Sequence, residues 1–166
     1  MVEVSWQAAS QFTRWASQVS GLALELPTEA QWEYAARSGG QALAYPWGNR
    51  FDPTKCVHSV GGEPTMARTA SLERSDQLFL VRFGGAELLD MVGNVWQWCQ
   101  DWYEPYPAGT ATNPKGPKTG TLRVARGGAW LNKETSDFRC CNRGSFDQNN
   151  GDWFSNWGLR LAATVS

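Results

Sequence analysis

The chain has 166 residues, of which 42% are hydrophobic and 19% charged, with ten tryptophans and a formal net charge of -1. This length fits one ordinary domain, residues 1–166, and the wealth of indoles and small residues is typical of an irregular, loop-rich fold. The near-neutral charge excludes an electrostatic footprint for nucleic acid, and no run approaches the ~18 to 20 apolar residues that a membrane span requires.

Two helices are predicted in the first quarter of the chain. Ser5 can cap a helix whose apolar residues follow helical spacing from Trp6 to Val19 and which ends near Gly21. A capping box at Thr28-Glu29-Ala30-Gln31 predicts a second helix, which should run to about Arg37.

After Tyr45 the helical pattern gives way to turn chemistry. The phrases YPWGN, GGEP, PYPAG, NPKGPKTG and RGG separate short runs such as LRVAR and GLRLA. Glycine and proline at this density favour short strands joined by long loops. The sequence therefore predicts a single α+β unit.

The sequence shows no signal for secretion and none for a histidine-based metal or catalytic site. The first residues, MVEVSWQAAS, have no basic region and no apolar core of a secretory signal, so we expect a cytoplasmic location. The four cysteines show no CxxC spacing, and His58 is the only histidine. A histidine-rich zinc site and a histidine-dependent catalytic triad are therefore not expected.

Several phrases now point to one superfamily, in the order in which its members carry them: VSWQAASQF, LPTEAQWEYAAR, YPWGN, LLDMVGNVWQWCQDWY, RVARGGAW and GLRL. They cover nearly the whole chain, from Val4 to Leu161, and they resemble the formylglycine-generating-enzyme type of the C-type lectin fold. The resemblance implies two helices packed on short, twisted antiparallel strands with extensive ordered loops. A core of tryptophans agrees with it: Trp32, Trp47, Trp96, Trp98 and Trp130.

One branch of this superfamily is enzymatic. The formylglycine-generating oxidases, which the chain resembles, bind copper(I) with two cysteines, the first directly after the GG-[SA]-[WY]-L phrase and the second a few residues later. Here Asn132 holds the first place, and residues 133–138 contain no cysteine. Cys140 and Cys141 are adjacent, and neighbouring strand residues point to opposite faces, so chelation by this pair is not expected. We expect no catalytic residues and no enzymatic activity, with an oxidoreductase like these oxidases or the related sulfoxide synthases as the alternative.

The C-terminal stretch RCCNRGSFDQNNGDWFSNWGLRL favours ligand binding instead. It combines large aromatics with asparagine, serine, aspartate and glycine and has almost no aliphatic residues. Antibody paratopes use this mixture, because aromatic side chains give contact area at low entropic cost while small polar ones give adaptable hydrogen bonds. We predict an exposed face with the anchors Phe138, Phe146, Trp153 and Phe154 and the polar contacts Asn132, Asn142, Ser145, Asp147, Asn149, Asn150, Asp152 and Ser155. For each aromatic residue the alternative is core packing.

The chain also resembles the variable proteins of diversity-generating retroelements. These proteins are diversified at adenines, often in Asn codons, within a C-terminal region that ends at a GFRL-like phrase. The resemblance implies that residues 129–161 form a sequence-variable region for an unknown protein or glycan ligand. Trp153, Trp157 and Gln148 cannot come from an Asn codon altered at its adenines, and ordinary drift in an exposed loop also yields Asn and Ser.

The resemblance also implies a structural calcium site, and we expect no other cofactor. In related folds the loop matched by DMVGNVWQW holds calcium through positions that correspond to Asp90, Gly93, Val95 and Gln97. A glutamate is usual where this chain has Gln97, and the exchange removes one charge and a bidentate carboxylate. We therefore expect a weak site or none, with Asp90 and Gln97 bonded to the loop as the alternative.

Overall fold

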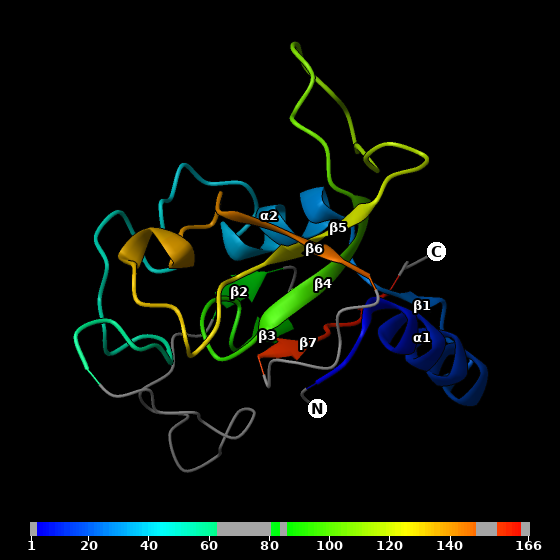
Figure 1. The fold of residues 1–166 in the computed structure, drawn as a ribbon, viewed down its shortest axis with the longest axis horizontal. Helices are drawn as coiled ribbons and strands as arrows, with labels where there is room; N and C mark the ends of the chain where they lie inside the picture. The colour runs from blue at the N-terminus through cyan, green and yellow to red at the C-terminus, as the bar shows by residue number, and fades with distance from the viewer. Residues whose placement is uncertain (1–2, 63–80, 84–85, 149–155, 164–166) are drawn as a thin grey trace.

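The computed structural model describes residues 3–62, 81–83, 86–148 and 156–163 (Figure 1). Its centre is a four-stranded sheet in the order β6-β5-β4-β7, with β4 antiparallel to β5, β5 antiparallel to β6 and β7 parallel to β4. These strands are β4 (Trp96–Trp102), β5 (Leu122–Arg126), β6 (Arg143–Asp147) and β7 (Trp157–Gly158). The parallel β7 departs from the purely antiparallel strands expected from the sequence.

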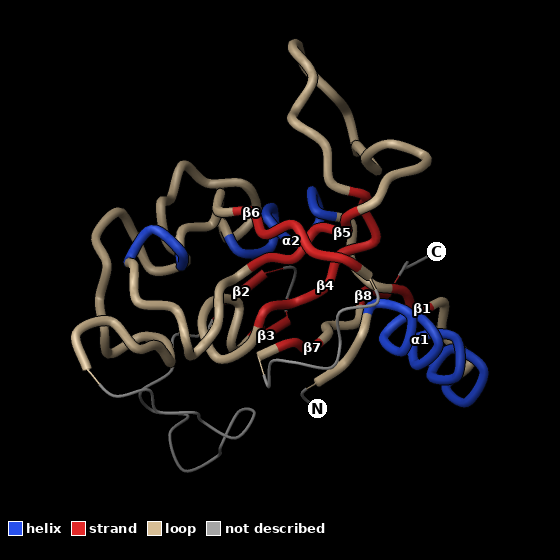
Figure 2. Tube along the Cα trace, in the orientation of Figure 1, coloured by secondary structure: helices blue, strands red, loops and turns tan. Residues whose placement is uncertain are grey.

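Two small antiparallel ladders flank this sheet. One pairs β1 (Leu24–Glu25) with β8 (Ala162–Ala163), so the end of the described chain lies beside the segment that follows the first helix. The other pairs β2 (Val81–Phe83) with β3 (Ala86–Leu88). Loops make up much of the remainder, and the loop that follows β4 projects away from the central sheet (Figure 2).

Both predicted helices are confirmed. Helix α1 (Trp6–Ser20) begins after Ser5, whose hydroxyl accepts from the Ala8 amide, and ends at Gly21 with φ 73°. Helix α2 (Glu29–Ala36) begins after Thr28, and both hydrogen bonds of the expected capping box are present. The apolar stripe of α1 is only partly buried, because Trp15 and Val19 are 57% and 68% exposed.

The central sheet has a hydrophobic core on each face. Alternate residues of a strand point to opposite faces, so Val124 packs with Trp32 and Phe138 while Ala125 packs with Trp98 and Trp157. The expected tryptophan core is confirmed for Trp32, Trp96 and Trp98, which are at most 7% exposed, whereas Trp47 and Trp130 are half-buried. Within the described residues, no helix is long and apolar enough to cross a membrane.

Candidate ligand-binding segment

The described part of the predicted binding segment is a loop that leaves β5 and returns as β6. It contains a short 3-10 helix, Thr135–Phe138, and β6 then pairs with β5 over Arg143–Asp147, at the outer position of the sheet. The sequence supports this turn, because Gly127 and Gly128 take the positive φ angles 97° and 70°, and a Cβ at Gly128 would lie 2.9 Å from the Asp137 carbonyl. The two ends of the loop are thereby held on adjacent strands.

Side-chain amides fix the inside of this loop. The side-chain oxygen Oδ1 of Asn132 accepts from the Ala129 amide at 2.8 Å, and the side-chain nitrogen Nδ2 of Asn132 donates to the Asp137 carboxylate at 2.8 Å. Asn142 donates through Nδ2 to the Asp137 backbone oxygen at 3.0 Å. Asn132 and Asn142, predicted as adaptable ligand contacts, therefore form hydrogen bonds that hold the loop.

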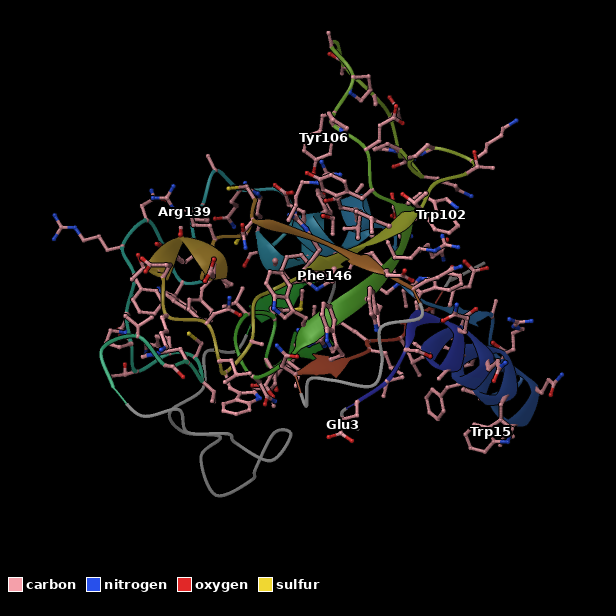
Figure 3. All side chains as sticks on the ribbon, in the orientation of Figure 1. Glu3, Trp15, Trp102, Tyr106, Arg139 and Phe146 are labelled. Atoms are coloured by element: carbon pink, nitrogen blue, oxygen red, sulfur yellow. The ribbon has the colours of Figure 1, made fainter. Side chains whose placement is uncertain are left out.

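The two described aromatic anchors lie inward, which corrects the prediction of exposed anchors. Phe138 has no exposed area and packs 5.6 Å from Phe51, ring centre to ring centre. Phe146, which is labelled in Figure 3, is half-buried, and its ring meets that of Trp157 edge to face at 4.2 Å between ring centres. The segment has few aliphatic residues, so Phe138 and Phe146 contribute much of its apolar contact with the two cores.

The remaining predicted contacts fall into two groups. Ser145 is half-buried and Asp147 exposed, both on β6. Another set lies outside the described residues: Asn149, Asn150, Asp152, Trp153, Phe154 and Ser155. Exposed side chains of the described loop also include residues that the prediction did not select: Lys133, Glu134, Thr135, Ser136, Arg139 and Cys141. Figure 3 shows Arg139 pointing away from the molecule.

Two arginines, the buried Arg126 and the half-buried Arg143, connect this loop to α2. Arg126 has no exposed area and donates to the Cys140 and Asn142 carbonyls and to the Glu33 carboxylate. Arg143 binds both carboxylate oxygens of Glu29, at 2.6 and 2.8 Å. These arginines therefore hold loop carbonyls and carboxylates of α2 together. Sequence reasoning missed Glu29 and Glu33 as their partners, because α2 is about a hundred residues away in the chain.

The cysteines do not fit a copper(I) site. All four are free, and Cys56, Cys99 and Cys140 are buried while Cys141 is exposed. The Cys140 thiol donates to the Ala36 carbonyl, and burial raises its pKa to about 12. A copper site of this kind needs two convergent thiolates, whereas the Cys140 thiol faces the core and its neighbour faces solvent. Asn132, at the first oxidase cysteine position, is instead hydrogen-bonded to Asp137 within the 133–138 stretch.

The side chain of Gln97 in the predicted calcium loop is fully hydrogen-bonded to other protein groups. The Gln97 Oε1 accepts from Trp32 Nε1 at 2.9 Å and from Arg160 Nε at 3.0 Å, and Gln97 Nε2 donates to the Asp90 carbonyl at 2.6 Å. Arg160 also donates to the Leu89 carbonyl, so a guanidinium lies beside this loop. Both lone pairs of the Gln97 side-chain oxygen are used in these hydrogen bonds, so this oxygen has no lone pair left for calcium in this arrangement.

Comparison with known proteins gives a consistent family assignment. The model of the sulfatase-modifying factor enzyme 1-like domain matches residues 1–165. A formylglycine-generating enzyme of Streptomyces coelicolor is 37% identical over 86% of this chain and 44% of its own length, and that of Mus musculus is 34% identical over 98% and 44%. An inactive C-alpha-formylglycine-generating enzyme 2 of Mus musculus is 33% identical over 82% of this chain and 39% of its length. The chain therefore spans less than half the length of these relatives.

Solved structures agree with the predicted fold. Treponema denticola variable protein 1 superposes with a TM-score of 0.76 at 20% identity, over 98% of this chain and 70% of that one. PvdO from Pseudomonas aeruginosa superposes with a TM-score of 0.78 at 22% identity, over 99% and 61%. The α+β fold of the formylglycine-generating-enzyme type is confirmed. The expectation of no enzymatic activity is contradicted by these relatives, because those at 34 to 37% identity are named as enzymes.

Proposed function

The chain belongs to the sulfatase-modifying factor enzyme 1-like family, and on this premise we propose that it binds a protein or glycan ligand through its C-terminal segment. Residues 129–161 present the contact residues, and a diversity-generating retroelement varies them. The likeness in fold to a protein named as a variable protein supports this proposal, as does the mixture of aromatic and small polar residues.

One structural observation carries the proposal: anchored and outward-facing side chains are separated within the loop. Asn132, Phe138 and Asn142 face inward and hold its course. Lys133, Thr135, Ser136 and Arg139 are exposed. Exchanging exposed side chains leaves the inner contacts in place, and this is the property that a varying binding surface on a fixed scaffold needs.

Sequencing the neighbouring DNA tests the retroelement part of this proposal. We expect an adjacent reverse-transcriptase gene and a near-copy of the segment for residues 129–161 that differs from it at adenines. The codons for Asn132 and Asn142 act as an internal control, since changes there should be rare among sequenced copies of the gene. A locus without the near-copy, or differences spread evenly over all four bases, would contradict the retroelement.

Oxidation of a peptide cysteine is a second candidate, favoured by the names of relatives at 34 to 37% identity. The copper-binding cysteine pair does not fit, as described above, so no step of that reaction is assigned to residues of this chain. Mass spectrometry of a cysteine-containing peptide incubated with the chain, copper(I) and oxygen tests this candidate. An aldehyde product that forms only with the chain present would support it.

A further inference from the structure

A pocket of about 840 Å³ lies between α2 and the loop that follows β4. Glu33 and Tyr34 line it from α2, Tyr106 from the loop, and Trp102 from the end of β4. Figure 3 shows Tyr106 near the base of the loop. Sites for small molecules commonly measure ~300 to 1,000 Å³, so this volume is large enough for one. Among the lining residues only Arg143 belongs to the C-terminal segment, so this site goes beyond the proposed function.

The two walls of the pocket are held together by Arg143. Its guanidinium binds the Glu29 carboxylate of α2 and donates to the Glu104 carbonyl of the loop at 2.9 Å. The Tyr106 hydroxyl also donates to Glu29, at 3.1 Å. The loop comes close to β4 at Gly116, where φ is 69° and a Cβ would lie 3.1 Å from the Asp101 Cβ. A site fixed in this way loses little conformational entropy when a ligand binds.

Aromatic surface in the pocket is exposed to solvent. Tyr34 and Tyr106 are 53% and 62% exposed, and Trp102 is half-buried. The Tyr34 ring lies close against Gly40, which has φ 82°, and the absence of a side chain there makes room for it, because a Cβ would be 2.8 Å from the Tyr34 Cε2. The pocket therefore offers flat apolar faces next to carboxylates and hydroxyl groups.

The charges around the pocket favour an uncharged ligand. Glu29 is paired with Arg143, and Glu33 with Arg37 and Arg126. A guanidinium already lies on two of the rings: Arg123 is 3.4 Å from the centre of Trp102 and Arg143 is 3.9 Å from the centre of Tyr106.

A cationic ligand on the opposite face of either ring would be repelled by the guanidinium already there. An anionic ligand would find cations in the lining, Arg37, Lys115 and Arg143, but it would also meet the exposed carboxylate of Glu104. The lining thus mixes both signs of charge and selects neither, whereas a neutral ligand that carries hydroxyl groups can hydrogen-bond to acidic and basic side chains alike.

We propose that this pocket binds a neutral saccharide. A sugar ring presents flat C–H faces, which stack on aromatic rings, and a rim of hydroxyl groups, which exchange hydrogen bonds with carboxylates and tyrosine hydroxyls. Tyr34 and Tyr106 supply the stacking faces, and Glu104 supplies an exposed acceptor at the rim.

Titration of the whole chain with defined oligosaccharides, followed by tryptophan fluorescence, tests the site. The neutral probes are maltotriose, cellotriose, chitotriose and mannotriose, and the charged probes are a heparin tetrasaccharide and trilysine. We expect saturable binding of at least one neutral probe and none of the charged ones. Binding of a charged probe alone, or of no probe at millimolar concentration, would overturn the proposal.

Substitutions of residues that line the pocket test whether the sugar binds there. Tyr34→Ala and Tyr106→Ala should each lower the affinity for the sugar about tenfold, as expected for loss of a main contact. Trp15→Ala removes an aromatic residue of similar exposure from α1 and should leave the affinity unchanged. Sugar binding that survives both tyrosine changes would place it elsewhere and refute this site. Lys133→Ala should have no effect, so the result is independent of the C-terminal binding segment.

Discussion

The side-chain amide of Asn132 donates to the carboxylate of Asp137 at 2.8 Å, and this contact joins two positions within the loop that precedes β6. The same amide accepts from Ala129, and the Asn132 backbone oxygen accepts from the Ser59 amide at 3.1 Å. Asn132 stands where the resembling oxidases carry their first copper-binding cysteine. In this chain the position holds the loop in place.

Removing the Asn132 side chain should therefore destabilise the fold. Asn132→Ala leaves the Ala129 amide and the Asp137 carboxylate without a partner, which should lower the free energy of unfolding by about 1–3 kcal/mol. Urea denaturation of both proteins measures this change. The adjacent exposed variant Lys133→Ala should shift it by less than about 0.5 kcal/mol. Equal losses in the two variants would show that the amide does not hold the loop.

Arg126 and Arg37 both pair with Glu33, and comparing them tests the role of burial. Arg126→Met should cost about 3–5 kcal/mol, because it removes the buried partner of Glu33 and of two loop carbonyls. Arg37 lies nearer the surface, with its side chain 22% exposed, so Arg37→Met should cost no more than about 1 kcal/mol. Thermal unfolding of the two variants at the same pH gives the comparison, and a reversed order would contradict this account of the buried arginine.

Thiol labelling should distinguish the adjacent cysteines. Iodoacetamide at pH 8 should modify Cys141 in the folded protein, whereas Cys56, Cys99 and Cys140 should react only after denaturation, because they are buried. Mass spectrometry of the labelled protein counts and locates the modified residues. Rapid modification of Cys140 in the folded state would contradict its position in the core.

The raised pKa of Cys140 also predicts that the stability of the fold decreases at alkaline pH. Burial lifts this pKa from 9.0 to about 12, so the folded state favours the protonated thiol. The stability that this provides is fully present below pH 9 and is lost as the pH rises towards 12. Cys140→Ser should therefore show a smaller loss of stability between pH 9 and 11 than the unchanged chain, measured by urea denaturation. An identical loss in both would show that another group controls this range.

Calcium should have little effect on the fold. Gln97 uses its side-chain oxygen for Trp32 and Arg160, so millimolar calcium should leave the melting temperature of the chain unchanged. The measurement is a thermal melt with calcium and with a chelator. A rise of many degrees with calcium that Asp90→Ala abolishes would show that these residues form a cation site.

The sequence predicts those features whose signals are local. Ser5 and Thr28 mark the helix starts because a capping hydrogen bond spans only three residues, and both caps are present. Phe138 was misread because its segment has no aliphatic pattern, although the short 3-10 helix turns its ring into the core. The pocket was not predictable, since its walls meet through Arg143 and Glu29, which are 114 residues apart in the chain. Such pairings depend on tertiary structure and leave no periodic signal.

The central claim is that the C-terminal loop combines a fixed interior with replaceable outward positions. A library with random substitutions at Lys133, Thr135, Ser136 and Arg139, displayed on yeast and sorted for protease resistance, tests it most directly. A matched library at Asn132, Asp137, Phe138 and Asn142 is the control. We predict that most members of the first library stay folded, because exposed substitutions typically change stability by less than about 0.5 kcal/mol, and that most of the second do not. Equal loss of folded members from both libraries would contradict the claim, since a loop that tolerates no change on its outer side cannot serve as a variable binding surface.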